Sequence, residues 1–332
     1  MADSDDFSTW ATPQGELPLP VLSVVIPCYN EEAVILATHS RLSSVLEGVG
    51  RSYEVIYVDD GSQDSTRELL GSLVAQDRAV RVVGFSRNFG HEAASTAGIA
   101  HARGRAVVVM DADLQDPPEL ISKMVELWDQ GFQVVYAQRV SRRSDTAFKR
   151  LAATLFYRLL SRLTDVAIPR DTGDFRLMDR KVVDAFLSMP EHNRFVRGMI
   201  AWTGFRQIAL PFERPKRFAG MTKYPTIKGI RLAISAILAF STVPLRLAAW
   251  LGAISAFLSL VGIIYALASK LVFQISIPGW ASVFIAILFL GGVQLLSLGI
   301  IGEYIGVIYE EVKGRPLYVV QERLPLNEEV DK

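Results

Sequence analysis

Residues 106–118 read AVVVMDADLQDPP, an apolar run that stops at two aspartates one residue apart. The run has the length and the β-branched composition of a buried strand. Pro117 and Pro118 then fix a turn. In sheets of mostly parallel strands, ligands bind beyond the carboxyl ends of the strands. Asp111 and Asp113 are therefore predicted to lie at the binding edge of such a sheet.

Further short apolar runs surround this one, and segments of helical length separate them. Such alternation predicts βαβ crossovers and an α/β fold with a mostly parallel sheet. Polar residues follow each run, so they are predicted to gather at one edge of the sheet. The apolar runs are residues 22–26 (LSVVI), 53–58 (YEVIYV), 80–85 and 134–137. The polar ends are residues 27–31, 59–62, 86–90, 111–116 and 138–139.

The composition excludes several classes of protein. The 35 basic and 35 acidic residues balance, so no overall field recruits nucleic acid. A single cysteine, Cys28, excludes an internal disulfide and a cysteine-based zinc site, and it is expected to be a packing residue. Residues 1–20 lack the basic and apolar regions of a signal peptide and are interpreted as a disordered acidic leader.

The C-terminal third predicts two membrane spans. Residues 247–269 and 280–302 contain no Asp, Glu, Lys, Arg or His. A helix over either stretch is about 35 Å long, enough for a hydrocarbon core of about 30 Å. We expect a transmembrane hairpin within residues 244–305 and a cytoplasmic tail over residues 306–332.

Charges beside the spans predict their orientation. Arg246, Lys313 and Arg315 flank the outer ends, against Lys270 alone in the connecting loop. By the positive-inside rule, the front half and both termini are expected in the cytoplasm, with the spans in the plasma membrane.

Two amphipathic stretches lie between the sheet and the spans. Residues 145–163 carry leucines on one face, flanked by Lys and Arg, as in a helix that lies in a membrane interface. The alternative is an ordinary helix that covers the sheet. Residues 226–243 are a second, juxtamembrane candidate.

Asp111 and Asp113, with Gln115 beside them, form a candidate site for Mg²⁺ or Mn²⁺. Hard cations prefer oxygen ligands, and phosphate oxygens and waters would complete the shell. A pair of loop aspartates is by itself weak evidence for a metal. A second acidic strand end, at residues 59–62, points to the same edge, although it also fits a capped turn before a helix.

Five motifs in order resemble family 2 glycosyltransferases with the GT-A fold. More narrowly, the chain is similar to polyprenyl-phosphate glycosyltransferases of the GtrB type and, more distantly, to dolichol-phosphate mannose synthases. The resemblance covers about residues 20–320, including the sequences GEYIG (302–306) and YEEVK (309–313) at the end of the second span. The five motifs are VIPCYNEE (25–32), DDGS (59–62), SRNFG (86–90), DADLQDPP (111–118) and GDFRL (173–177).

The resemblance implies a glycosyltransferase domain over residues 21–225 and a role for individual residues. Asp174 occupies the position of the catalytic base, and Asp111, Asp113 and Gln115 would hold the metal and the diphosphate. Arg217 and Lys223 would meet a lipid phosphate. The residues implied to contact the nucleotide sugar are Pro27, Tyr29, Glu31, Asp60, Asp111 and Arg139.

Each of these roles has a plainer alternative. Asp174 could be a helix cap or a salt-bridge partner of Arg176. Arg217 and Lys223 could only set the membrane topology. A phosphate acceptor is mostly dianionic at neutral pH, so we hypothesise that Asp174 orients the acceptor or steadies the transition state rather than removing a proton. The four histidines, His39, His91, His101 and His192, show no ligand spacing and are expected on the surface or in packing.

These observations predict an inverting enzyme that moves one sugar from a nucleotide donor to undecaprenyl phosphate. The resemblance favours glucose from UDP-glucose; GlcNAc, mannose and an aminoarabinose derivative remain open. A processive polysaccharide synthase is disfavoured, since the chain has no Gln-x-x-Arg-Trp segment and only two spans. A non-catalytic, membrane-anchored binder of sugar nucleotides is the other alternative. Relatives suggest a homo-oligomer, such as a tetramer, whose spans could pack through Gly291, Gly292 and Gly299.

Overall fold

A computed structural model of the chain describes residues 19–140, 172–213, 242–271 and 279–325. The described residues fall into two compact units. One unit holds the sheet and its helices, and the other holds the two long C-terminal helices, α9 (Val243–Leu271) and α10 (Trp280–Lys313).

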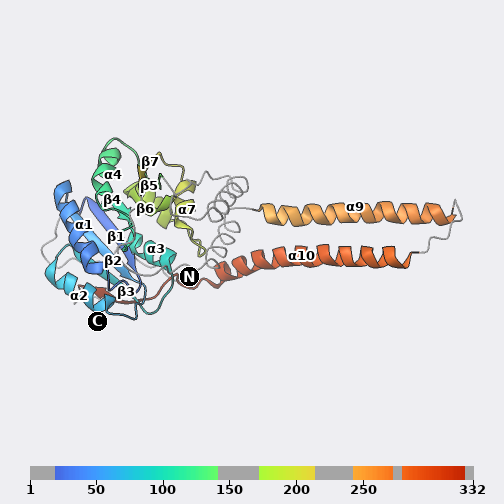
Figure 1. Cartoon of the computed structure of the whole chain (residues 1–332), viewed down its shortest axis with the longest axis horizontal. Coiled ribbons are helices and arrows are strands. Elements are labelled where there is room, and N and C mark those ends of the chain that lie inside the picture. The colour runs from blue at the N-terminus through green and yellow to red at the C-terminus, as the bar shows by residue number, and fades with distance from the viewer. Residues whose placement is uncertain (1–18, 141–171, 214–241, 272–278, 326–332) are drawn as a thin grey trace. The chain divides into compact units, whose positions relative to one another are not determined.

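The first unit is an α/β domain built on one mixed sheet (Figure 1). Its strands are β1 (Leu22–Cys28), β2 (Tyr53–Asp59), β3 (Val80–Phe85), β4 (Ala106–Val109), β5 (Val134–Arg139), β6 (Thr172–Asp179), β7 (Gln207–Phe212) and β8 (Val320–Leu324). Its helices are α1 (Ile35–Val49), α2 (Thr66–Gln76), α3 (His91–His101), α4 (Leu120–Asp129), α6 (Arg180–Leu187) and α7 (Val196–Trp202).

The strand order is β7-β5-β6-β4-β1-β2-β3-β8. β1 pairs in parallel with β2 and β4, β2 with β3, and β5 with β7. β6 runs antiparallel between β4 and β5, and β8 runs antiparallel along β3. The expected mostly parallel α/β sheet is thus confirmed at its centre, with two antiparallel strands that the sequence did not predict.

Helices cover both faces of the central strands, which explains why those strands read as continuous apolar runs. Every residue of β1 is buried. Leu42 and Leu46 of α1 pack with Leu22 and Val24 on one face. On the other face, α3 packs so closely that a Cβ at Gly98 would lie 2.1 Å from Cγ1 of Val25.

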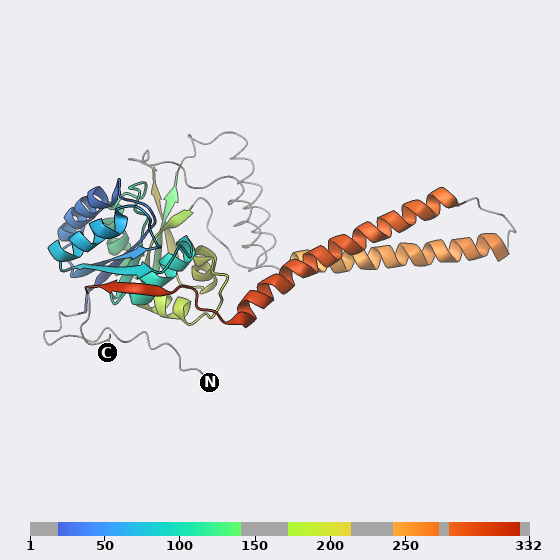
Figure 2. The same ribbon diagram turned by 90° about the horizontal axis from the view of Figure 1, so that it is seen from below.

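The second unit contains the two predicted spans (Figures 1 and 2). The windows Val243–Tyr265 and Ile285–Lys313 both have a mean hydropathy of 2.2, and almost none of either is buried within the protein. Both helices are long and apolar enough to anchor the chain in a membrane. α9 begins before the predicted start at residue 247, and α10 continues beyond the predicted end at residue 302.

The segment predicted as a tail, residues 306–332, has structure of its own. Its first residues complete α10, which ends at Gly314 in the left-handed conformation that favours glycine. Residues 320–324 then form β8 at the edge of the sheet (Figure 2). The physical reason is that β3 would otherwise be an open edge with unpaired backbone groups.

Candidate active site

The register of the sheet brings two sequence-distant carboxylates together. β6 is antiparallel to β4, so the start of β6 lies at the carboxyl end of β4. Val109 is paired with Arg176. Asp111, two residues after Val109, and Asp174, two residues before Arg176, therefore come to the same edge of the sheet. This is the edge at which the sequence predicted a binding site.

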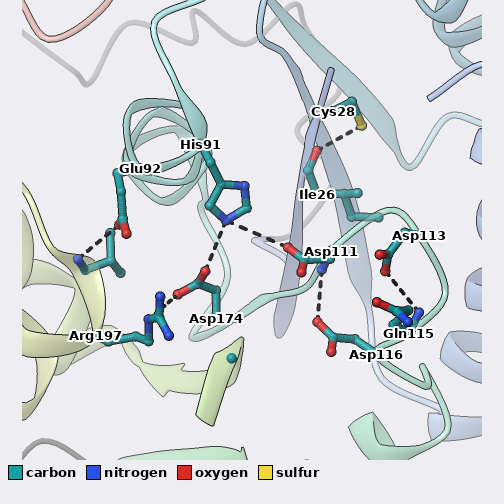
Figure 3. A network of polar contacts seen from close by, with 12 residues as sticks. Ile26, Cys28, His91, Glu92, Asp111, Asp113, Gln115, Asp116, Asp174 and Arg197 are labelled. Atoms are coloured by element: carbon teal, nitrogen blue, oxygen red, sulfur yellow. Dashed lines mark hydrogen bonds and ion pairs between the residues drawn. The ribbon is translucent and has the colours of Figure 1, made fainter. Parts of the chain in front are cut away.

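His91 and Arg197 contact the two oxygens of Asp174 (Figure 3). Nε2 of His91 donates a hydrogen bond to Oδ2 of Asp174 at 3.1 Å. Nε of Arg197 forms an ion pair with Oδ1 at 3.1 Å. The same Nε2 of His91 lies 3.7 Å from Oδ1 of Asp111. We refer to Asp111, Asp174, His91 and Arg197 as the carboxylate cluster.

The charges in the carboxylate cluster stabilise one another. Burial by itself would raise the pKa of Asp174, but Arg197 and the hydrogen bond from His91 outweigh burial and hold this pKa well below the usual range. Burial lowers the pKa of His91, yet Asp174 and Asp111 outweigh it and raise the pKa to about 10. At neutral pH the imidazole is a cation and Asp174 is an anion.

One alternative took Asp174 to be a salt-bridge partner of Arg176. In the structure, Arg176 does not pair with that carboxylate. Its guanidinium donates instead to the backbone carbonyls of Gly173 and Asp174, at 2.9 and 3.3 Å. Arg139, from the end of β5, lies on the other side of the same turn. A Cβ at Gly173 would come within 3.3 Å of its Nη2. Arg139 thus lies beside the residue that precedes Asp174, and its contact with the donor's phosphates stays a prediction.

The loop after β4 carries the predicted metal ligands. The backbone N–H of Gln115 donates to Oδ1 of Asp113 at 3.0 Å, and the N–H of Asp111 donates to Asp116 at 3.3 Å. In the same loop, the carbonyl of Ala112 accepts a hydrogen bond from the hydroxyl of Thr38 of α1 at 2.7 Å. In Figure 3 Asp111 lies between His91 and Asp174 on one side and the Asp113 turn on the other.

These residues fit a magnesium-type cation. Within the residues that the structure describes, no three His, Cys, Asp or Glu side chains converge into a metal cage. Asp111 and Asp113 would supply one or two carboxylates. This suits Mg²⁺, which is usually held by one or two carboxylates together with substrate phosphates and waters.

The loops after β1 and β2 are fastened to each other. Asn30 has a positive φ of 53°, and its backbone N–H donates to Ser62 at 2.9 Å. Its side-chain oxygen accepts from the N–H of Gln63 at 2.7 Å. Pro27 is buried in β1, whereas Tyr29 and Glu31 are half-buried in this joined loop. Their contact with a nucleotide stays a prediction.

The carboxylate of Asp60 is buried and forms hydrogen bonds within the protein. It is only 3% exposed and accepts hydrogen bonds from the N–H groups of Phe89 and Gly90, at 2.6 and 2.9 Å, and from Nδ2 of Asn88 at 2.9 Å. Burial is the main reason that its pKa is raised. Asp60 thereby holds the SRNFG loop that leads into His91. Its predicted contact with the nucleotide stays a prediction.

The interpretation of His91 as a surface or packing histidine was wrong. The signal that could have identified it is its place directly after the SRNFG loop, at the same sheet edge as Asp111. Arg197, from α7, had no signal in the sequence. Cys28 is buried, as expected of a packing residue. Arg217, Lys223, the interfacial helix predicted at 145–163 and residues 226–241 lie outside the described residues.

Two family matches cover most of the chain. Residues 23–187 match the family described as glycosyl transferase family 2, and residues 243–308 match the GtrB C-terminal hairpin. The chain is 49% identical over 299 residues to the uncharacterized glycosyltransferase YkcC of Bacillus subtilis, covering 90% of this chain and 93% of that one. The chain belongs to glycosyltransferase family 2.

Another relative of this family 2 glycosyltransferase is the SfII prophage-derived bactoprenol glucosyl transferase of Shigella flexneri. The two are 39% identical over 300 residues, which is 90% of this chain and 97% of the relative. Among solved structures, glucosyl-3-phosphoglycerate synthase from Mycobacterium tuberculosis, in complex with Mn²⁺, UDP-glucose and phosphoglyceric acid, matches with a TM-score of 0.45 and 20% identity. That match covers 66% of this chain and 78% of the synthase. Membership in glycosyl transferase family 2, together with the mixed α/β sheet, confirms the expected GT-A fold.

Proposed function

We propose that this glycosyltransferase moves a single glucose from UDP-glucose to the phosphate of undecaprenyl phosphate, also called bactoprenol phosphate. The observation that carries the proposal is the likeness to a bactoprenol glucosyl transferase over 97% of that enzyme's length, apolar hairpin included. A hairpin of this kind keeps the enzyme at the surface where a lipid phosphate is found.

The reaction is a direct displacement at the anomeric carbon. An oxygen of the acceptor phosphate forms a bond to the anomeric carbon. At the same time, the bond between the anomeric carbon and the β-phosphate oxygen of UDP breaks. UDP leaves with the electron pair, and the configuration inverts to a β-linked lipid-phosphate sugar. The acceptor phosphate, with a second pKa of about 6, is mostly dianionic at neutral pH. The reaction therefore requires no proton transfer.

The state of Asp174 suits such a reaction. A carboxylate held by Arg197 and His91, with its pKa well below the usual range, is a weak base. Its fixed negative charge can orient reactants and stabilise positive charge that develops on the sugar ring. This supports an orienting or electrostatic role for Asp174 rather than proton removal.

Asp113, with Asp111 beside it, would hold Mg²⁺ or Mn²⁺ against the diphosphate of the donor. The cation, when bound, neutralises the charge that develops on the leaving group. Arg139 lies beside Gly173, the residue before Asp174, and would add a further positive charge on the donor side. Arg217 and Lys223 are proposed for the acceptor's phosphate, and the tetramer stays a prediction.

The experiment is transfer of labelled sugar in membranes that contain the chain. Labelled UDP-glucose, Mg²⁺ and undecaprenyl phosphate should give a label that extracts into organic solvent and is released by mild acid. EDTA and the Asp113→Ala variant should each abolish it. A panel of nucleotide sugars identifies the donor. Tight nucleotide binding without any lipid product from that panel contradicts the proposal and favours a non-catalytic binder.

A further inference from the structure

His91 lies where a single ring nitrogen faces two carboxylates from different strand ends. Its Nε2 is 3.1 Å from Asp174, a hydrogen bond, and 3.7 Å from Asp111, a charge contact that is too long for one. Because one N–H cannot donate fully to both, the proton is directed at Asp174. Figure 3 shows the ring between the two side chains.

This position has an electrostatic reason. Two carboxylates that both approach one nitrogen within 4 Å repel each other, and a donor between them offsets the repulsion. Arg197 holds only the other oxygen of Asp174. Without His91, Asp174 would be fixed from one side and would be driven away from Asp111.

The imidazole itself is held on a fixed loop. It is the first residue of α3, directly after the loop whose backbone N–H groups at Phe89 and Gly90 are bound by Asp60. The next residue, Glu92, accepts from the N–H of Val196 at 3.1 Å. That contact joins α3 to α7, the helix that carries Arg197. The two groups that hold Asp174 are therefore linked to each other through the side chain of Glu92.

We propose that His91 is a positioning residue for sugar transfer, which sets the carboxylate of Asp174 relative to Asp111. It acts through Asp174 and does not touch the sugar. The inference rests on the proposed function, since it assumes that Asp111 serves the donor side and Asp174 the reacting centre. A site that must hold these two groups in register needs such support, because small displacements of a reacting group are costly.

A double-mutant cycle on the full chain in detergent tests this role. Release of nucleoside diphosphate is measured for wild type, His91→Ala, Asp174→Asn and the double variant, with undecaprenyl phosphate present. We expect His91→Ala to lower kcat roughly 100-fold. The KM for the nucleotide sugar should stay within about threefold, since ground-state binding is not removed. The double variant should be no slower than Asp174→Asn alone.

Two amide variants test the geometry without a large cavity. In His91→Gln the amide nitrogen reaches the place of Nε2, whereas in His91→Asn it falls short. We expect His91→Gln to recover at least about tenfold in kcat over His91→Ala, and His91→Asn to recover little. Equal rates for the two amides contradict the proposal. This comparison tests the proposal even when His91→Ala fails to fold.

His39→Ala is the matched control, because His39 also lies against an aspartate, with its Nε2 3.5 Å from Asp77, in another part of the domain. It should change stability and leave kcat unaltered. The thermal midpoint and the Kd for UDP are measured for every variant. Losses that multiply in the double variant overturn the positioning role. So does a His91→Ala kcat within about threefold of wild type.

The two proposals fail separately. A wild-type chain that releases nucleoside diphosphate but makes no lipid-linked sugar contradicts the proposed acceptor, and the cycle is still measured on that release. A wild-type chain that makes the lipid-linked sugar, with multiplicative losses in the cycle, contradicts only the role of His91.

Discussion

Asp174 is held at both carboxylate oxygens, by Arg197 at Oδ1 and by His91 at Oδ2, each at 3.1 Å. Burial opposes this charge, but the two partners outweigh burial and depress the pKa. A carboxyl group with a depressed folded-state pKa is protonated only at strongly acid pH. Asp174 therefore stays ionised wherever the enzyme is assayed, and the acid limb of the rate should follow the second ionisation of the acceptor phosphate, at about pH 6.

Asp174→Asn should lower kcat by about 100- to 1,000-fold, because the fixed charge at the reacting centre is lost. The acid limb of the pH–rate profile should remain where it is in the wild type. Rates between pH 5.5 and 9 check this, with Asp184→Asn on the exposed side of α6 as the control. A variant rate that continues to rise above this acid limb, and so approaches the wild-type rate at alkaline pH, would instead assign a base to Asp174.

Gly61 controls the loop that leads to His91. Its φ is +68°, and a Cβ there would lie 2.5 Å from the carbonyl carbon of Arg87, a backbone atom that cannot move alone. Gly61→Ala should lower the free energy of unfolding by about 1–3 kcal/mol and displace the loop, with a loss of activity. Gly71→Ala is the control, since a Cβ at Gly71 in α2 meets nothing and the substitution should stabilise the helix. Thermal unfolding of both variants in detergent is the measurement; equal midpoints would contradict the steric explanation.

At the scale of elements, the segment from Tyr318 through β8 contacts the end of β3 and the loop that follows it. The ring of Tyr318 stacks on Phe85 with centroids 4.9 Å apart, and the N–H of Ser86 donates to the carbonyl of Val319 at 3.0 Å. Glu322 forms an ion pair with Arg67. The segment thus supports the same loop that Asp60 holds from the other side.

Tyr318→Ala should lower the free energy of unfolding by about 1–3 kcal/mol, because a stacked aromatic is lost and the edge of β3 is less well covered. Activity should fall as well, since the loop before His91 loses support. Gln321→Ala, at an exposed position of β8, is the control. The thermal midpoint and kcat are measured together. A Tyr318→Ala variant with both values of wild type would show that β8 gives the loop no support.

Two histidines, the half-buried His39 and the buried His101, give the domain a pH-dependent stability. Burial lowers the pKa of His39, and Asp77 offsets this only in part. Burial also lowers the pKa of His101. A base with a lowered folded-state pKa binds its proton more readily when unfolded, so its contribution is complete above the unfolded pKa of about 6.5 and is lost as pH falls below it. The raised pKa of His91 acts in the opposite sense, so the assignment is tested by comparing two chains: the thermal midpoint of His39→Gln should fall less steeply from pH 7 to pH 5 than that of the wild type. Equal slopes for the two chains contradict the assignment.

The sequence predicted those elements whose pattern is local. β1 and β4 are continuous apolar runs, and α9 and α10 are long segments without charge. β6 was missed because Asp174 and Arg176 interrupt its apolar pattern, and its place between β4 and β5 depends on distant partners. β8 was missed because its sequence, VQERL, is short and polar, as an edge strand often is.

The candidate site likewise contains residues that the sequence predicted and residues that it did not. Asp111 was predicted at this edge, because polar residues after parallel strands meet there. Asp174 was predicted only by the resemblance of its GDFRL motif to family 2 glycosyltransferases. His91 and Arg197 could not be predicted as their partners. Their contacts depend on how α3 and α7 pack beside β6, and no spacing in the sequence encodes that arrangement.

At the scale of the whole molecule, the chain joins a polar catalytic domain to a hairpin with an apolar surface. Many large apolar side chains of α10 are not covered by other parts of the protein. Among them, Leu295 is 72% exposed and Leu298 is 62% exposed. An apolar surface of this extent is unfavourable in water and is accommodated by lipid. The charges beside the spans favour a cytoplasmic catalytic domain, with Arg246 and Lys313 at the outer ends.

The orientation can be tested with thiol labelling, because Cys28 is 2% exposed and should stay unlabelled in the folded chain. A cysteine at Ser276, between α9 and α10 in the sequence, should react with a membrane-impermeant maleimide added to intact cells. A cysteine at Val312, which is 78% exposed near the end of α10, should react only after the membrane is permeabilised. Both variants should retain activity, since neither position lies in the carboxylate cluster. The reverse pattern would place the sheet outside the cell, away from the cytoplasmic supply of nucleotide sugars, and would contradict the proposed reaction.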